Sequence, residues 1–318
     1  MISPLIFLSI GLGLLIWSAD RFIFGAAAIA RNFGIAPMLI GLTIVSIGSS
    51  APEAMVAASA ALEGKLDTAV GNVIGSNITN ITLILGVAAL LKPLLVSSST
   101  LIKEMPLMLG GTLLAGYLMQ DLSLSRWDGL LLLAAFIMVI ALLIINAYRT
   151  HDDKLTQASE EEVPDDISTP RALLWLVIGM ILLPLAAEMM VTNAVTIARY
   201  FGLSDLVIGL TIIAVGTSLP ELAACIAGLS KGEDDLVIGN VVGSNLFNIL
   251  AVLAVPALLA PGMIDPAAAG KDFGVMLATS LAPLLILLLK RNHTIGRIEG
   301  AVLLLCFVIY QISLFYSS

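Results

Sequence analysis

The chain has 318 residues, of which 59% are hydrophobic and 12% charged, and its mean hydropathy is +1.04. These values exclude a soluble globular domain and indicate a protein whose helices lie largely in a lipid bilayer. The net charge of −8 argues against a nucleic-acid partner, and the two cysteines, Cys225 and Cys306, lie in apolar runs and make no disulfide framework.

Ten apolar runs follow one another along the chain, each near the length needed to cross a hydrocarbon core of roughly 30 Å. Because they lack the alternation typical of barrel strands, we predict an all-α polytopic membrane protein. The first run lacks the basic start and the cleavage site of a secretory signal, so we expect a retained helix. The expected helices cover Pro4–Phe24, Pro37–Leu62, Thr68–Leu91, Leu101–Met119, Trp127–Ala147, Ala172–Ile197, Asp205–Leu229, Leu236–Leu259, Gly270–Leu289 and Ile298–Phe315.

A single long polar segment, residues 148–171, separates two halves of five expected helices each, residues 1–147 and 172–318. The segment is acidic, but it has no glycine-punctuated loop of alternating acidic ligands. A solvated linker is therefore favoured over a calcium sensor. The two histidines, His151 and His293, fall in expected loops. Their position argues against a transition-metal site inside the membrane.

The two halves share an internal repeat. The segment Gly41–Gly86 returns without a gap as Gly209–Ala254, at a constant offset of 168 residues. Since each half has an odd number of expected spans, the two copies must enter the membrane from opposite sides, as in transporters built from inverted repeats. With the N-terminus outside, eleven Lys and Arg residues fall in cytoplasmic loops and four in outer loops. The positive-inside rule therefore predicts both termini outside and a cytoplasmic linker.

Each copy of the repeat interrupts an apolar run with a proline and a glutamate, in Gly48–Glu53 (GSSAPE) and Gly216–Glu221 (GTSLPE). Pro52 lacks an N–H and displaces the carbonyl four residues before it. Free carbonyls and a carboxylate near the middle of a membrane are tolerated only where they face protein, water or an ion. We therefore predict a broken helix in each half that offers main-chain oxygens, hydroxyls and one carboxylate. The alternative is an ordinary helix start at the membrane boundary, with the glutamate in water.

The helix that follows each glutamate carries amide and hydroxyl groups at every fourth position, which places them on one face. Glycines at the same spacing, Gly71 and Gly75 in one copy and Gly239 and Gly243 in the other, favour close helix packing. Hydrogen bonding between helices is thus an alternative to a polar stripe that faces the broken helix, which we prefer. The stripe consists of Asn72, Ser76 and Asn80, and of Asn240, Ser244 and Asn248, with Asn77 and Asn245 beside them.

Together these groups form an oxygen-rich centre with two carboxylates and no Cys, His or Lys, which suits hard cations rather than zinc or copper. Two close carboxylates repel each other, so we expect the pair to take one Ca²⁺, several Na⁺ or a proton, in competition. Such competition is a physical basis for exchange. A passive cation channel and an intramembrane serine protease are alternatives. The protease lacks a histidine in any expected span to act as general base.

The motifs GSSAPE and GTSLPE, followed by GNVIGSN and GNVVGSN, resemble the paired α-repeats of the sodium/calcium exchanger family of cation/Ca²⁺ antiporters. The short linker is similar to that of compact prokaryotic members. The resemblance implies ten transmembrane helices in two inverted repeats, and a multi-pass protein of the plasma membrane (the prokaryotic inner membrane). It implies an antiporter rather than an enzyme, exchanging Ca²⁺ for Na⁺ by alternating access, without a cofactor or an obligate protein partner. Related K⁺-dependent and H⁺-coupled exchangers share much of the motif, so the coupling ion stays open.

The resemblance also implies roles for single residues. Glu53 and Glu221 become the central ligands of Ca²⁺ and Na⁺, and the main-chain oxygens of Ser49 and Thr217 complete the calcium site. The first and sixth helices slide past the rest of the bundle. Asp20 and Glu188, also 168 residues apart, are either gate residues or interfacial charges. Sodium sites are lined by Ser50, Ser76, Ser218 and Ser244 and by the carbonyls of Ser46 and Ala214, and the centre is faced by Asn80 and Asn248, although some members carry an acid in place of Asn248.

Overall fold

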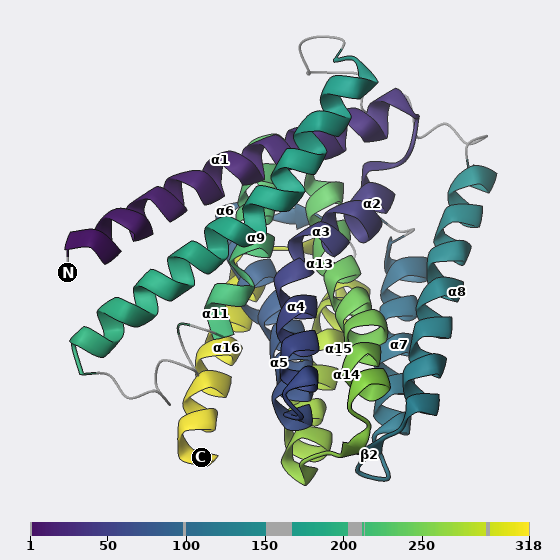
Figure 1. Cartoon of the computed structure of the whole chain (residues 1–318). Coiled ribbons are helices and arrows are strands. Elements are labelled where there is room, and N and C mark those ends of the chain that lie inside the picture. The colour runs from purple at the N-terminus through teal and green to yellow at the C-terminus, as the bar shows by residue number, and fades with distance from the viewer. Residues whose placement is uncertain are drawn as a thin grey trace.

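The structure, a computed structural model, describes residues 2–97, 100–150, 167–202, 212, 214–290 and 293–317. Helices occupy nearly all of these ranges (Figure 1). In the first half they are α1 (Ile2–Asn32), α2 (Pro37–Ile40), η1 (Gly41–Val45), α3 (Ser46–Ser49), α4 (Ala51–Leu62), α5 (Leu66–Thr79), η2 (Asn80–Ile84), α6 (Leu85–Leu91), η3 (Thr100–Glu104), α7 (Met105–Leu118) and α8 (Arg126–Thr150), where η marks a π-helical turn. In the second half they are α9 (Thr169–Tyr200), α11 (Ala214–Thr217), α12 (Leu219–Ser230), α13 (Asp234–Phe247), η6 (Asn248–Val252), α14 (Ala254–Leu259), η7 (Ala268–Asp272), α15 (Phe273–Leu289) and α16 (Arg297–Ser317).

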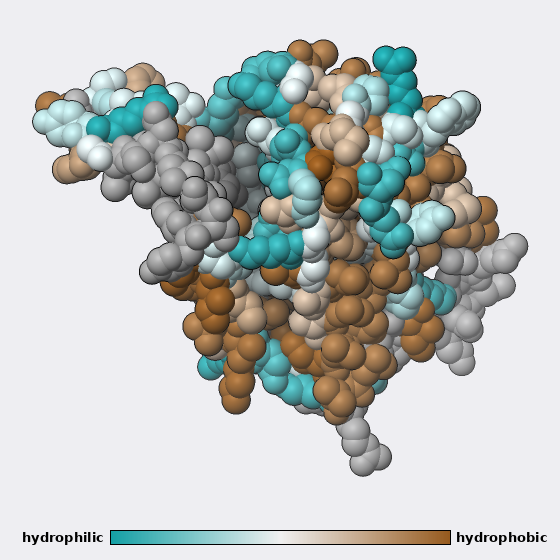
Figure 2. All heavy atoms as spheres, turned by 90° about the horizontal axis from the view of Figure 1, so that it is seen from below, coloured by the Kyte–Doolittle hydropathy of each residue, from teal (hydrophilic) through white to brown (hydrophobic). Residues whose placement is uncertain are grey.

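The described helices confirm a polytopic helical membrane protein. Seven are long and apolar enough to cross a bilayer, and Pro37–Ser49 with Ala51–Leu62 forms an eighth candidate span, bent by 46°. The acidic part of the linker and the start of the expected helix Asp205–Leu229 lie outside the described residues. Figure 2 shows apolar side chains covering much of the surface, as expected for a protein surrounded by lipid. Large exposed apolar residues include Ile137 and Met138 on α8 and Val302 and Leu305 on α16.

The expected end of the first helix is wrong, because α1 continues eight residues beyond Phe24, to Asn32. Helix α9 (Thr169–Tyr200) extends the expected Ala172–Ile197 by three residues at each end. The apolar run stops near Asp20 and Arg21, but the segment after it is rich in alanine, a strong helix former. Its alanines pack in the interior, which stabilises the extra turns.

Two short strand pairs, which the sequence did not predict, join the two halves. Strand β1 (Leu94–Leu95) pairs antiparallel with β4 (Thr294–Ile295), and β2 (Ser123–Leu124) pairs with β3 (Gly262–Met263). These pairs define two ends of the molecule, the β1–β4 end and the β2–β3 end. The label β2 marks the second of these at the bottom of Figure 1.

The polar stripes lie on two antiparallel helical segments, α5–α6 and α13–α14. At the β2–β3 end, the backbone N–H of Asp265 donates to Oδ1 of Asp67, with 2.7 Å between the two atoms. At the β1–β4 end, Nζ of Lys92 lies 2.8 Å from Oδ1 of Asp234. Each contact joins the start of one segment to the chain just beyond the end of the other, so the two segments run in opposite directions.

Helices α1 and α9 lie side by side across the remaining bundle. They cross it diagonally, and the N-terminal end of α1 points away from it (Figure 1). The apolar cluster around their contact includes Phe22 and Leu183, together with Ala224 of α12 and Leu236 of α13. A larger core, which includes Ile81, fills the rest of the bundle. The α1–α9 pair therefore packs on the bundle through α2, η1, α12 and the start of α13.

The expected close packing at Gly239 and Gly243 is confirmed. A Cβ atom at Gly239 would lie 2.5 Å from the carbonyl oxygen of Met38, and one at Gly243 would lie 2.5 Å from that of Leu42. Since backbone cannot yield as a flexible side chain does, only glycine allows α13 to approach η1 this closely. By the 168-residue offset, the matching neighbours of Gly71 fall among residues 203–211, which lie outside the described residues.

We expect Gly243→Ala to destabilise the protein by about 1–3 kcal/mol, the usual cost of forcing an extra group into a packed interior. The thermal unfolding midpoint in detergent measures the effect. Gly110→Ala on α7 is the control, because no atom lies within 4 Å of the added Cβ. Equal midpoints for the two variants would contradict the close approach.

Candidate cation site

Both predicted helix breaks occur where the sequence placed them. Helix α3 ends at Ser49 and α4 begins at Ala51, so Ser50 is the break. In the second half, α11 ends at Thr217 and α12 begins at Leu219, with Ser218 between them. Because Pro52 and Pro220 lack an N–H, the carbonyl four residues before each of them has no helical donor.

The serine at each break donates its hydroxyl to the glutamate of the other half. Both serines are N-cap residues, and an N-cap serine commonly accepts a hydrogen bond from the backbone of the helix it precedes, but neither does so here. Instead, Oγ of Ser50 lies 2.6 Å from Oε1 of Glu221. In the matching contact, Oγ of Ser218 lies 3.4 Å from Oε1 of Glu53. The two crossed hydrogen bonds bring both glutamates to the boundary between the halves.

Each glutamate lies in the first turn of a twelve-residue helix, Glu53 in α4 and Glu221 in α12. The unpaired N–H groups of a helix start favour a negative charge there. The side chains are deeply buried, with exposed fractions of 0% for Glu53 and 1% for Glu221. The alternative of a helix start with its glutamate in water is therefore wrong. A charge at such a position costs at least about 2.5–3.5 kcal/mol unless it is compensated.

Both polar stripes contact this centre, through Asn72 on α5 and Asn240 on α13. Oγ of Ser49 donates to Oδ1 of Asn240 on α13 over 3.1 Å. The amide Nδ2 of Asn72 on α5 donates to the backbone carbonyl of Glu53 over 3.1 Å. Asn72 and Asn240 occupy matching positions, yet Nδ2 of Asn72 bonds a main-chain oxygen, whereas Nδ2 of Asn240 has no partner among the described residues. The centre is therefore asymmetric at these two amides.

Asn80 and Asn248 lie deeper along the same two segments, and each begins a π-helical turn. Both side chains are fully buried, and neither their amide oxygens nor their amide nitrogens have a partner among the described residues. Turns of this kind often occur at functional sites, because they free backbone groups and re-aim side chains. No sequence signal pointed to these turns.

A third pair of amides crosses between the stripes. Nδ2 of Asn77 donates to the backbone carbonyl of Asn245 over 3.2 Å, and Nδ2 of Asn245 donates to the carbonyl of Asn77 over 3.3 Å. The sequence placed both residues beside the stripe but not in the site. Their identity at matching positions was a usable signal, because matched residues of two copies can bond reciprocally only where the two copies face each other. The pair holds α5 against α13 next to Ser76 and Ser244.

The predicted site residues lie mainly in the interior of the described chain. Thr217 is half-buried and Ala214 is the first residue of α11. The hydroxyl of Ser46 bonds back to its own helix, to the carbonyls of Leu42 and Thr43. Among the described residues, no hydrogen bond joins the stripe residues Ser76, Ser244, Asn80 and Asn248 to either carboxylate. Apart from Thr217 and Ala214, the predicted site residues are all buried: Ser46, Ser49, Ser50, Glu53, Ser76, Asn80, Ser218, Glu221, Ser244 and Asn248.

The composition of this centre fits a hard cation. The buried polar residues of the described chain include two carboxylates and no Lys, Arg or His, and no three acidic, His or Cys side chains gather among them. A buried polar atom without a partner costs about 1–3 kcal/mol, so ions or water bound here would stabilise the fold. Hydroxyl, amide and carboxylate oxygens are the ligands that Na⁺ and Ca²⁺ take. Among the described residues, the unpartnered atoms of this centre are Oε2 of Glu53 and of Glu221, both amide atoms of Asn80 and of Asn248, Oδ1 of Asn77 and of Asn245, Nδ2 of Asn240 and Oγ of Ser244.

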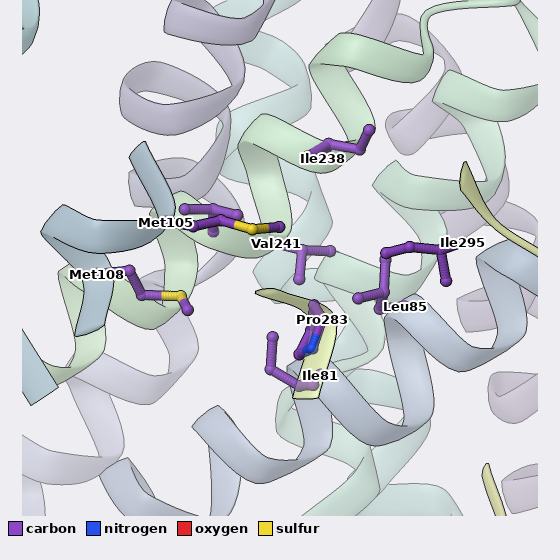
Figure 3. Close-up of a pocket in the computed structure, with 9 residues that line it drawn as sticks. Ile81, Leu85, Met105, Met108, Ile238, Val241, Pro283 and Ile295 are labelled. Atoms are coloured by element: carbon purple, nitrogen blue, oxygen red, sulfur yellow. The ribbon is translucent and has the colours of Figure 1, made fainter. Parts of the chain in front are cut away.

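The bundle also contains a small cavity lined by apolar side chains. Figure 3 shows it between the segments η2–α6, α7, α13 and α15, with apolar side chains around it. Its volume is about 10 Å³, and Ile81, Leu85, Met108, Val241 and Pro283 are among its lining residues. Such a space barely holds one water molecule and offers it no polar partner. It is a packing gap in the scaffold rather than a site for a cation.

The amino-acid sequence is similar to those of known transporters and membrane proteins. The sequence profile described as "Sodium/calcium exchanger protein" matches residues 3–145 and 171–316. The putative antiporter CaxA of Alkalimonas amylolytica is 54% identical over 319 residues, covering all of both chains. The inner membrane protein YrbG of Escherichia coli is 46% identical, over 98% of this chain and 96% of that protein.

The fold matches as well. A structure of the sodium-calcium exchanger NCX_Mj soaked with Na⁺ and Sr²⁺ superposes with a TM-score of 0.83 at 32% identity, covering 97% of each chain. With both halves of the sequence matched and the whole fold shared, the chain belongs to the sodium/calcium exchanger protein family and is a cation/Ca²⁺ antiporter, a transporter rather than an enzyme.

Proposed function

We propose that this protein exchanges Ca²⁺ for Na⁺ across a prokaryotic inner membrane by alternating access. Glu53 and Glu221 are the ligands that both ions share. The observation that carries this proposal is the pair of crossed bonds, Ser50 to Glu221 and Ser218 to Glu53, which bring two buried carboxylates from opposite halves together. One divalent ion or several monovalent ions can neutralise such a pair, so the ions exclude each other.

The surrounding groups give each ion its remaining ligands. In this proposal, the main-chain oxygens of Ser49 and Thr217 complete the calcium site, while hydroxyls and carbonyls of the two breaks and stripes hold Na⁺. The orphaned amides of Asn80 and Asn248 support such a role, because a buried amide oxygen without a donor is free to bind a cation. When the site is empty, the carboxylates of Glu53 and Glu221 stay charged and buried. The transition that opens the site to the other side of the membrane is therefore unfavourable unless an ion or a proton is bound.

The membrane topology of the proposal follows from the same repeat. The chain crosses ten times, as two inverted five-helix repeats, with both termini outside and residues 148–171 in the cytoplasm. The inverted orientation of the two repeats is supported by the antiparallel course of the segments α5–α6 and α13–α14. The β1–β4 end is then cytoplasmic, and the charged residues Lys92, Lys231 and Lys290 lie there.

Purified protein in liposomes tests the coupling. We expect Na⁺-loaded liposomes to take up ⁴⁵Ca²⁺ from a Na⁺-free medium, and uptake to stop when a Na⁺ ionophore abolishes the gradient. Imposing K⁺ and pH gradients one at a time distinguishes K⁺-dependent and H⁺-coupled exchange at the same site. Uptake that needs no counter-ion gradient of any kind would contradict exchange and indicate a channel.

A further inference from the structure

A cluster of charged and aromatic side chains joins α1 to the bundle at the β1–β4 end. Nζ of Lys231, at the end of α12, lies 2.5 Å from Oδ1 of Asp20 on α1. Nε of Arg21 lies 3.5 Å from the other carboxylate oxygen. The Arg21 guanidinium lies 5.2 Å from the centre of the Trp175 ring on α9, and the Lys231 ammonium lies 5.7 Å from that of Phe24. Cations at these distances are attracted to the ring faces.

The bond between Lys231 and Asp20 differs from the other ion pairs of the described residues in what it connects. It runs from the bundle to the α1–α9 pair, which also packs on the bundle through apolar residues such as Ala224 and Leu236. Lys92–Asp234 and Lys290–Glu299 each join parts of the bundle, and Lys65–Glu63 lies within one loop. Breaking the first pair therefore affects the position of α1 and α9 without loosening the bundle.

At the opposite end of the α1–α9 pair, a recess separates the pair from α11 and α12. The recess is apolar, has a volume of about 340 Å³, and is lined from α1 and α9 by Leu8, Met190 and Val191 and from α11 and α12 by Val215 and Leu219. No described ion pair bridges this recess. At the β1–β4 end, by contrast, the Lys231–Asp20 ion pair ties α1 to the bundle.

The repeat does not carry the same pair of charges to the opposite end. The 168-residue offset places Glu188 at the position of Asp20, and Glu63 at the position of Lys231. A mirror-image contact would therefore bring two carboxylates together. The carboxyl of Glu63 accepts from Nζ of Lys65 over 2.7 Å, and this hydrogen bond and charge hold the pKa of Glu63 below its usual range. Glu63 is thus ionised and repels Glu188 if the two approach.

We propose that Asp20 and Lys231 form a one-sided latch that holds α1 and α9 against the bundle at the β1–β4 end. The latch favours the conformation closed at that end over its mirror image. Asp20 is therefore a conformational residue rather than a ligand. This inference rests on the proposed alternating access, in which both conformations are populated.

Distances between spin labels test the latch without any need for transport. Labels at Leu5 on α1 and Trp127 on α8, both exposed, report the position of α1 in a Cys225→Ala, Cys306→Ala background. We expect Asp20→Asn and Lys231→Gln each to lower the ratio of the favoured to the other conformation about two- to fivefold, the range for an exposed ion pair. The charge swap, Asp20→Lys with Lys231→Asp, should restore most of that ratio.

Two further variants sharpen the test. Lys92→Gln removes an ion pair within the bundle and should leave the ratio unchanged. Glu63→Lys supplies a cation opposite Glu188 and should move the ratio in the same direction as Asp20→Asn, by stabilising the mirror conformation. An unchanged ratio in both Asp20→Asn and Lys231→Gln overturns the latch, as does a charge swap that restores nothing. A single distance in the parent protein under Na⁺, Ca²⁺ and ion-free conditions would instead overturn alternating access itself.

Discussion

Replacing either central glutamate by glutamine is expected to abolish exchange. Glu53→Gln and Glu221→Gln keep the side-chain volume but remove one of the two buried charges that a Ca²⁺ ion must balance. Leaving a buried charge without its partner costs about 3–5 kcal/mol. That cost corresponds to more than about a hundredfold in affinity. We therefore expect ⁴⁵Ca²⁺ uptake by Na⁺-loaded liposomes to fall to background in both variants.

A binding measurement separates this effect from a failure to fold. Ca²⁺ bound only to the native state raises the unfolding temperature of the parent protein. The glutamine variants should unfold at a temperature that no longer depends on Ca²⁺, yet should be at least as stable as the parent in ion-free buffer, because charge repulsion is gone. Asp121→Asn, at an exposed carboxylate near the β2–β3 end, is the control and should transport normally. Full exchange in either glutamine variant would remove the carboxylate pair from the mechanism.

The helix breaks were predictable because their cause is local and occurs twice. Pro52 and Pro220 remove a hydrogen bond wherever they stand in a helix, and a glutamate after each of them, in the middle of an apolar run, needs a partner. The family resemblance added roles for Ser49, Thr217 and the stripe residues that the described contacts do not test. Those roles stay predictions until ion binding is measured.

The parts that sequence reasoning missed depend on contacts between distant segments. The expected end of α1 near Phe24 followed from the charges at Asp20 and Arg21, yet the helix continues because Lys231 and aromatic rings satisfy those charges. The strand pairs are two residues long, too short to leave a periodic signal. The π-helical turns at Asn80 and Asn248 have no compositional mark, because one extra residue in a turn leaves the apolar pattern almost intact.

We expect the second large effect, on stability, from substitutions of the reciprocal amides of Asn77 and Asn245. Asn77→Ala and Asn245→Ala each remove one buried hydrogen bond between α5 and α13 and leave a backbone carbonyl without its amide donor. Each should destabilise the protein by about 1–3 kcal/mol. Because both bonds hold the same crossing, the double variant should lose less than the sum of the two single losses.

A change in ion affinity distinguishes positioning of the site from stability alone. Ser76 and Asn80 flank Asn77, and Ser244 and Asn248 flank Asn245, so a looser crossing displaces the groups proposed to line the ion sites. We expect the apparent Ca²⁺ affinity of the folded fraction to fall about tenfold, which is 1.4 kcal/mol. Asn193→Ala is the matched control, because its amide donates to the carbonyl of Met189 within α9 and bonds no other helix among the described residues. If Asn77→Ala lowers the unfolding temperature but leaves Ca²⁺ affinity at the Asn193→Ala level, the pair stabilises the bundle without positioning the site.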